Sequence, residues 1–321
     1  MDAKMPIVTN KKWITLVACI LAISMLAGAV LAMTQREEGS LEYMPSTPAG
    51  SWLPTTLPQI LPTEPVLPSE PVKIPSHVGA TLQPSLSQNR VPPTLELNTF
   101  TKKDFGKSNG YVTCKSEEYW LGVDVSVWQE SINWEKVAAA GFKFAIIRVA
   151  YRGWSKAGEL HLDPRAKENL DGAIAAGLKV GVYIYSQAIN VQEAREEAQY
   201  VLDFLDGQAL DMPIVFDWEL PDKAISRARK VKAKTMQACA LAFCEEIIAA
   251  GYQPMVYFNQ WQGSHQYNLA ERRAAGAELW LAMYTRAMTY TYKVQMWQYT
   301  PEGKVPGIKT KVDINIYFPY H

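Results

Sequence analysis

The chain has no net charge and little of the chemistry that marks metal or nucleic-acid sites. Its 321 residues balance 32 basic against 32 acidic side chains, and no basic run is long enough to follow a phosphate backbone. We therefore expect no nucleic-acid partner. The four histidines and four cysteines lack the spacing of a zinc site, so we expect no metal and no cofactor.

The cysteines are too few and too scattered to predict a disulfide framework. Cys19 lies in an apolar run and Cys114 stands alone. Cys239 and Cys244 fall on one predicted helix but point to different faces of it. We expect these last two to be small buried side chains rather than a bridge.

An uncharged N-terminal segment is the first feature that the sequence does contain. Trp13–Met33 runs for 21 residues without a charge, and as a helix it would span roughly 31 Å, close to the thickness of a bilayer core. Three lysines in residues 1–12 predict a cytoplasmic tail and a single-pass membrane anchor, with the rest of the chain outside. A cleaved signal peptide, which would give a secreted protein, is the main alternative. A lipoprotein box at Leu16–Cys19 is a weaker one.

Residues 34–111 have a different composition. Twelve of the chain's 20 prolines lie between Pro45 and Pro93. Proline lacks the backbone N–H that sheets need, and such a segment cannot bury a core. We predict a disordered, proline-rich linker over this range.

From residue 112 to 321, strand and helix patterns alternate. Helices are predicted over Ile132–Ala140, after Asp163, after Asn190 and through Met236–Ile247, with Asn190 and Glu193 forming a capping box. Apolar strands separated by helices predict an α/β fold with a parallel sheet, and eight such strands favour a TIM-like barrel that is irregular towards its C-terminal end. The predicted strands are 121–126, 144–150, 180–185, 214–216, 255–258, 279–284, 294–299 and 312–318.

Acidic residues stand where these strands end. Asp124, Asp217, Glu219 and Asp313 each follow or interrupt a short apolar run. In such barrels the strand ends carry the chemistry, and paired carboxyl groups are the machinery of glycosidases. Asp217 and Glu219 are two residues apart and so share a face, where repulsion raises the proton affinity of one of them.

Aromatic side chains lie near the same strand ends. Their faces stack on sugar rings, although filling of the barrel is the alternative interpretation and is favoured for Trp280. Arg148 lies inside an apolar strand and should pair with a barrel carboxylate. The candidate sugar-binding residues are Tyr151, Tyr183, Tyr185, Trp218, Tyr257, Tyr284 and Trp297.

The ordered motifs of the globular part resemble glycoside hydrolase family 25, the Chalaropsis-type lysozymes or N-acetylmuramidases. They include Asp124-Val-Ser126, Asp217-Trp-Glu219, Trp297-Gln-Tyr299 and Val312-Asp313-Ile-Asn315, and the resemblance covers roughly residues 120–318. It implies a barrel of five β/α units and three further strands. It also implies retaining hydrolysis of the β-1,4 bond between N-acetylmuramic acid and N-acetylglucosamine in peptidoglycan.

The resemblance also implies roles for the four acids. Glu219 would be the general acid, and Asp217 would either attack the anomeric carbon or hold the substrate's own N-acetyl group. Asp124 and Asp313 would bind sugar or tune the protonation of that pair. A monomeric catalytic domain acting on peptidoglycan glycan strands is expected. An inactive glycan-binding barrel and a glycosidase acting on chitin are the alternatives.

Overall fold

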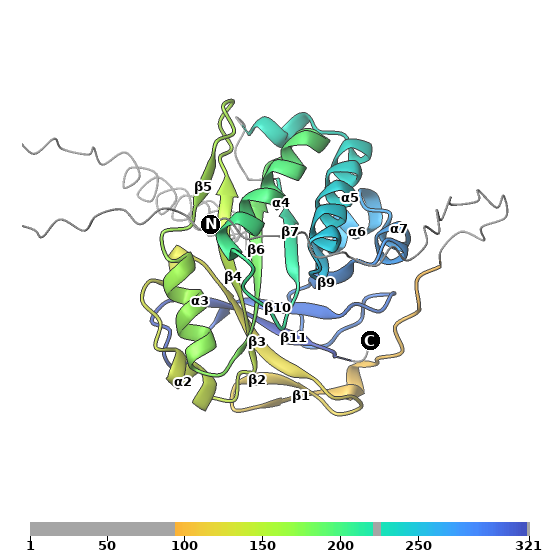
Figure 1. Cartoon of the computed structure of the whole chain (residues 1–321). Coiled ribbons are helices and arrows are strands. Elements are labelled where there is room, and N and C mark those ends of the chain that lie inside the picture. The colour runs from red at the N-terminus through yellow and green to blue at the C-terminus, as the bar shows by residue number, and fades with distance from the viewer. Residues whose placement is uncertain (1–93, 221–225, 320–321) are drawn as a thin grey trace, which may run out of the picture. The chain divides into compact units, whose positions relative to one another are not determined.

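Eight strands close into a barrel in the computed structural model, which describes residues 94–220 and 226–319 (Figure 1). The order around the barrel is β3-β11-β10-β9-β8-β7-β6-β4, and β4 pairs with β3 to complete the circle. This confirms the predicted fold class. The barrel strands are β3 (Trp120–Val125), β4 (Phe144–Arg152), β6 (Lys179–Ser186), β7 (Ile214–Trp218), β8 (Pro254–Asn259), β9 (Glu278–Ala282), β10 (Met296–Gly303) and β11 (Val312–Tyr317).

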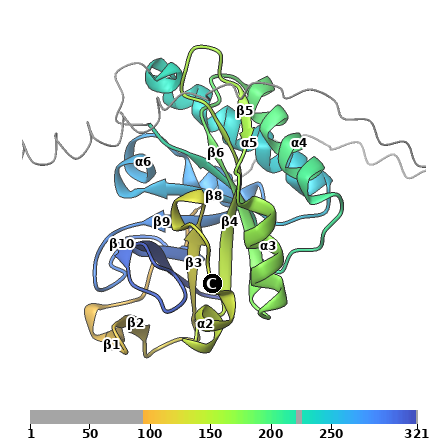
Figure 2. The same cartoon turned by 90° about the vertical axis from the view of Figure 1, so that its left-hand side faces the viewer.

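Helices follow the first five barrel strands, so the chain forms five β/α units before three strands without helices. The helices α3, α4 and α5 lie along the outside of the barrel (Figure 2). The small strand β5 (Leu160–Leu162) pairs with the end of β4. The helices are α2 (Trp134–Ala139), α3 (Ala166–Ala175), α4 (Val191–Leu205), α5 (Ala233–Ala249), α6 (Gln260–His265) and α7 (Leu269–Ala274).

The barrel closes through antiparallel pairs at its irregular side. Strands β3, β4, β6, β7, β8, β9 and β10 run parallel, whereas β11 runs antiparallel to both β10 and β3. The start of β11 therefore lies at the same rim as the C-terminal ends of the other strands. A short connection is enough to join antiparallel neighbours, which is why no helix is needed between β10 and β11.

The local sequence explains the element boundaries. In α4, the Asn190 side chain accepts a hydrogen bond from the Glu193 N–H at 2.9 Å, and the helix ends at Asp206 and Gly207, both with positive φ. The predicted capping box is incomplete, because the Glu193 carboxylate accepts instead from the Ile189 N–H at 3.0 Å. Cys239 and Cys244 are buried on α5 with free thiols, as predicted.

A β-hairpin precedes the barrel, and its first strand and turn lie inside the range 34–111 predicted as linker. It consists of β1 (Phe105–Ser108) and β2 (Tyr111–Cys114), joined by Asn109 and Gly110, both with positive φ. An Asn-Gly pair between two strands is a strong hairpin signal. The Phe105 ring packs against Trp297 at 5.4 Å between centroids, so apolar contacts hold this segment to the barrel.

Trp13–Met33, the predicted membrane anchor, and linker residues 34–93 lie outside the described residues. Within 94–220 and 226–319, none of the helices has the length and apolar character needed to span a bilayer. Membrane attachment therefore stays a prediction from the sequence.

Candidate active site

The four predicted acids meet at one rim of the barrel. Asp124 is on β3, Asp217 is on β7, Glu219 directly follows β7, and Asp313 is on β11. The antiparallel register places Asp313 directly opposite Asp124. All four line a pocket of about 220 Å³. Asp124 from the first barrel strand and Asp313 from the last therefore join Asp217 and Glu219 in one site.

Four of the predicted aromatic residues line the same pocket. Strand register explains the neighbours, because Tyr185 pairs with Asp217, Asp217 with Tyr257, and Tyr257 with Trp280 across adjacent strands. Paired positions on neighbouring strands face the same side of a sheet. Trp280, which the sequence favours as barrel filling, therefore also contributes to the pocket wall. The aromatic lining is Tyr183, Tyr185, Tyr257, Trp280 and Tyr284.

Two amides that were not predicted as site residues hold Asp124. Its Oδ2 accepts hydrogen bonds from Asn315 Nδ2 at 2.7 Å and from Gln298 Nε2 at 2.9 Å. The Gln298 Oε1 in turn accepts from the hydroxyls of Tyr257 at 2.9 Å and Tyr284 at 3.2 Å. These amides can donate to Asp124 while it is ionised, so they fix one acid and two aromatic side chains in a single network.

Burial raises the pKa values of the first and last acids. It raises the pKa of Asp124 to about 6, although the hydrogen bonds from Asn315 and Gln298 act in the opposite direction. Burial, together with the charge of Asp124, raises the pKa of Asp313 to about 8. Near neutral pH Asp313 therefore retains its proton while Asp124 is largely ionised.

Asp217 and Glu219 form an interacting acid pair. Burial raises the pKa of both carboxyl groups. The negative charge of Glu219 raises the pKa of Asp217 further, whereas the neighbouring Asp217 side chain acts against the rise in the pKa of Glu219. Among the described residues, Asp217 Oδ1 has no hydrogen-bond partner although it is buried. This environment favours one proton shared by the pair, which supplies one acid and one carboxylate at neutral pH.

The structure does not bring Trp218 and Trp297 to the pocket. Both side chains are fully buried, with indole N–H groups donating to the carbonyls of Ala188 at 2.9 Å and Met283 at 2.7 Å. The reason is strand alternation, since Trp218 is next to Asp217 and Trp297 is next to Gln298, and both of those face inward. These two tryptophans, which the sequence suggested as sugar contacts, therefore pack outside the barrel interior instead of facing the pocket.

Tyr151 and Arg148 also lie apart from the acid pocket. Tyr151 stacks on His161 at 5.1 Å and lies under the Arg148 guanidinium at 5.3 Å, and it is not among the residues lining the pocket. Arg148 Nε donates to Asp163 Oδ2 at 2.7 Å. The partner of Arg148 is thus the buried acid just before α3 and none of the four acids of the pocket.

A buried polar network supports the backbone on either side of Glu219. Gln187 Nε2 donates to the Glu219 carbonyl, and Gln262 Nε2 donates to the Trp218 carbonyl at 3.0 Å. Ser226 Oγ donates to Gln187 Oε1 at 3.0 Å, which connects this support to the segment that begins at Ser226. The position of the candidate acid therefore depends on side chains that do not line the pocket.

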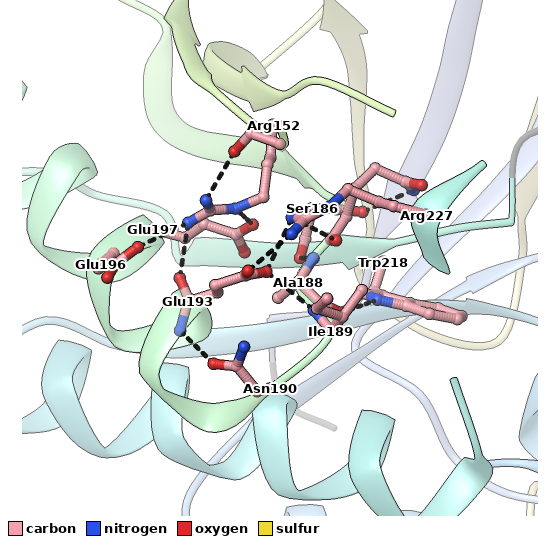
Figure 3. Close-up of polar contacts among 12 residues, drawn as sticks. Arg152, Ser186, Ala188, Ile189, Asn190, Glu193, Glu196, Glu197, Trp218 and Arg227 are labelled. Carbon is pink, nitrogen blue, oxygen red and sulfur yellow. Dashed lines mark hydrogen bonds and ion pairs between the residues drawn. The ribbon is translucent and has the colours of Figure 1, made fainter. Parts of the chain in front are cut away.

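Ion pairs anchor that network to α4 (Figure 3). The Arg227 guanidinium makes a two-point contact with the Glu193 carboxylate at 2.7 and 2.8 Å. Arg152 Nε donates to the fully buried Glu197 at 2.7 Å. Burial raises the pKa of Glu197 to about 7, with the Arg152 charge acting against this rise. Paired buried charges of this kind are expensive to break.

In the part of the chain that the structure describes, the side chains are not arranged as a metal site. Across the described ranges, no group of three or more histidine, cysteine, aspartate or glutamate residues is arranged to hold a metal ion. What the pocket offers is acid, carboxylate and aromatic surface. These are the groups that protonate a glycosidic oxygen, stabilise an oxocarbenium-like centre and stack on sugars.

We expect Asp313→Asn to stabilise the fold at pH 8 and not at pH 4. Because the pKa of Asp313 rises from 3.8 to about 8 on folding, the folded state resists ionisation. The stability present below pH 4 is lost as pH rises towards 8. Asparagine does not titrate, so the melting temperature of the Asp313→Asn variant at pH 8 should exceed that of the wild type by about 3–6 °C.

Thermal unfolding followed by circular dichroism at both pH values measures this difference. Asp203→Asn, at an exposed position of α4, is the matched control for the same change of side chain. An Asp313→Asn shift of the same size at the two pH values would show that folding does not disfavour the ionised form of Asp313.

Comparisons with known proteins agree with this geometry. Residues 123–308, more than half of the chain, match the model of the glycosyl hydrolases family 25. An uncharacterized Escherichia coli protein, YegX, is 26% identical over 217 residues, covering 61% of this chain and 68% of that protein. Lysozyme M1 of Streptomyces globisporus is 26% identical over 220 residues, covering 60% of this chain and 66% of that protein.

Solved structures show the same barrel. The autolysin LytC of Streptococcus pneumoniae superposes with a TM-score of 0.56 at 22% identity, over 67% of this chain and 52% of that one, so the present chain spans about half its length. A bacterial lysozyme of Streptomyces coelicolor gives a TM-score of 0.50 at 25% identity, over 62% of this chain and 91% of that one. With the family match over most of the barrel and the paired acids at its rim, this chain belongs to the glycosyl hydrolases family 25, a family of glycoside hydrolases.

Proposed function

We propose that this protein is a retaining N-acetylmuramidase that hydrolyses the β-1,4 bond between N-acetylmuramic acid and N-acetylglucosamine in peptidoglycan. The observation that carries the proposal is the interacting Asp217–Glu219 pair in the barrel pocket of a family 25 chain. The names of relatives support the substrate class: one is Lysozyme M1, and LytC was solved in complex with a synthetic peptidoglycan ligand.

Glu219 is assigned as the general acid. When Glu219 carries the shared proton, this side chain protonates the leaving glycosidic oxygen as the bond from that oxygen to the anomeric carbon breaks. In the second step Glu219, now a carboxylate, removes a proton from the attacking water. Glu219 then regains its starting protonation state, and the cycle consumes one water molecule.

Asp217 acts on the other side of the reacting sugar. It either forms a bond to the anomeric carbon or orients and polarises the substrate's N-acetyl group so that its oxygen forms that bond. Both routes retain configuration. Asp217 and Glu219 stand two residues apart at the end of β7 and line one pocket of about 220 Å³, and this proximity supports retention. Inverting enzymes hold their carboxyl groups about 6.5–9.5 Å apart to admit a water molecule.

The remaining pocket residues are assigned to binding and electrostatics. Asp124, fixed by two amides, places a further negative charge beside the positive charge that develops on the sugar. Asp313 in its protonated form can donate a hydrogen bond to a sugar hydroxyl. The 56% exposed Tyr284 offers the most accessible aromatic surface at the pocket for stacking.

We further propose that Trp13–Met33 anchors the protein in the cell membrane as a single-pass helix, with a monomeric catalytic barrel on the extracytoplasmic side. The uncharged run and the lysines before it support this placement. Cleavage after the run would release a secreted enzyme instead. Intact mass and membrane fractionation of the native protein separate the two forms.

Product analysis on purified peptidoglycan tests the activity. The full-length chain is expected to release fragments with new muramic acid reducing ends, which first form as the β anomer in proton NMR spectra. An initial α anomer would contradict retention. Equal or faster release from chitin would favour the chitinase alternative, and sedimentation with the wall without cleavage would favour an inactive binding barrel.

A further inference from the structure

A second and larger cavity lies beside the active-site pocket. It has a volume of about 1320 Å³ and lies between the β1–β2 hairpin, the loop after β9 and the end of β10. We call it the hairpin groove. The hairpin packs beside β10 at the lower left of Figure 2. The residues used below are Lys102, Lys107, Tyr111, Tyr284, Arg286 and Lys304, all of which line the groove.

The groove adjoins the pocket at Tyr284. Tyr284 lines both cavities, with its hydroxyl donating to Gln298 Oε1 inside the barrel and 56% of its surface exposed. The loop that begins at Tyr284 follows the C-terminal end of β9, and Thr300 to Lys304 extend beyond the pairing of β10 with β9. Both cavities therefore open at the same rim, and one extended ligand can occupy both.

The hairpin groove is lined by positive charge. Lys102, Lys107, Arg286 and Lys304 are exposed, and none has an ion-pair partner among the described residues. Among the described residues that line the groove, Glu302 alone is acidic, and it pairs with Lys311. In a chain with no net charge, this concentration of unpaired cations creates a local attraction for anions.

The groove wall is firmly built. The Tyr111 hydroxyl donates to the Lys304 carbonyl at 3.1 Å, and the Val112 N–H donates to the Tyr299 hydroxyl at 3.4 Å. Phe105 packs edge-on against Trp297. The hairpin also precedes residue 123, where the family match begins. The hairpin therefore lies outside the matched residues and forms a wall next to the active-site rim.

We propose that the hairpin groove binds the carboxylate groups of the peptide stems on the same glycan strand whose bond lies at Asp217 and Glu219. This inference rests on the proposed function. A pocket of about 220 Å³ cannot hold a polymer, so the strand must continue along the rim. The groove meets it there with four cations, which are complementary to the stem carboxylates.

Charge reversal in the groove tests the proposal by binding. Lys107→Glu/Lys304→Glu is made in the full-length chain carrying Glu219→Gln, so that the ligand is not cut. The matched control is Lys136→Glu/Lys143→Glu, which makes the same change in net charge. These two exposed lysines lie near the N-terminal end of β4, away from the active-site rim. Fluorescence polarisation measures Kd for labelled glycan fragments with stems and for fragments stripped of stems by an amidase.

We expect the groove variant to lower the preference for stem-bearing over stem-free fragments about tenfold, with a smaller effect at high salt. The control variant should keep the preference of its parent. An unchanged preference in the groove variant overturns the proposal. So does an effect that appears on intact wall but disappears after phosphodiester polymers are removed with acid, because the anion would then be phosphate.

Cleavage by the chain without Glu219→Gln separates this inference from the proposed function. Peptidoglycan hydrolysis together with an unchanged stem preference means that the muramidase assignment stands and the groove assignment falls. Loss of stem preference in the groove variant, without hydrolysis by the wild type, means that the groove recognises stems but the barrel does not cut.

Discussion

Glu219→Gln is expected to lower kcat on peptidoglycan by about 10²–10⁴-fold, the range for loss of a positioned general acid. Glutamine keeps the shape of the side chain but has no proton to give to the leaving oxygen. Because burial raises the pKa of Glu219, wild-type activity should persist above the usual range of a glutamic acid and fall as this proton is lost. The variant should lack that descending limb.

Initial rates of reducing-end release across pH 4–9 measure both effects. Glu278→Gln is the matched control, because Glu278 lies on β9 outside the acid pocket, and the amide oxygen of glutamine can still accept a hydrogen bond from the Tyr317 hydroxyl. A Glu219→Gln variant that keeps more than a tenth of wild-type kcat would remove Glu219 from the role of acid.

Asp217→Asn should combine a large loss of activity with a gain in stability. The loss is expected to be about 10²–10⁴-fold, because both retaining routes need a carboxylate at this position. The gain follows from burial, which raises the pKa of Asp217 and makes its ionised form unfavourable in the folded state. That penalty is absent below the usual aspartate pKa and grows as pH rises, so the stabilisation should appear at neutral pH and vanish at pH 4.

Kinetics and thermal unfolding of the same sample separate this outcome from a structural defect. A variant that loses activity and melts lower at neutral pH would show that Asp217 mainly supports the fold. A glycan whose muramic acid lacks its N-acetyl group then distinguishes the two routes in the wild type. Direct attack by Asp217 still cuts this substrate, whereas the assisted route does not.

Much of the barrel could be predicted because its signals are local. Apolar runs separated by capped helices predict parallel strands, and acids at the ends of those runs predict the rim that holds Asp124, Asp217 and Asp313. Strand alternation around Asp217 also carried the information that Trp218 faces outward, although the aromatic composition suggested sugar contact. In the hairpin, the Asn109–Gly110 turn was the available signal.

Other features depend on distant pairings that no local pattern specifies. Gln298 and Asn315 reach Asp124 across 174 and 191 positions of the chain. The support of Glu219 by Gln187 depends on a contact between the end of β6 and the residue after β7. The hairpin groove depends on how the β1–β2 hairpin packs against the loop after β9 and the end of β10. Such contacts follow from the closed barrel and its register, which only the three-dimensional structure supplies.

The seam between β3 and β11 also sets the order in which the enzyme can become active. Asp124 belongs to the first barrel strand and Asp313 to the last, and they face each other only when the circle closes. Contacts so distant in sequence are slow to form, because the long intervening chain must first be brought together. A nascent chain that has exposed Asp124, Asp217 and Glu219 therefore still lacks Asp313. Assembly of the cutting site coincides with completion of the fold.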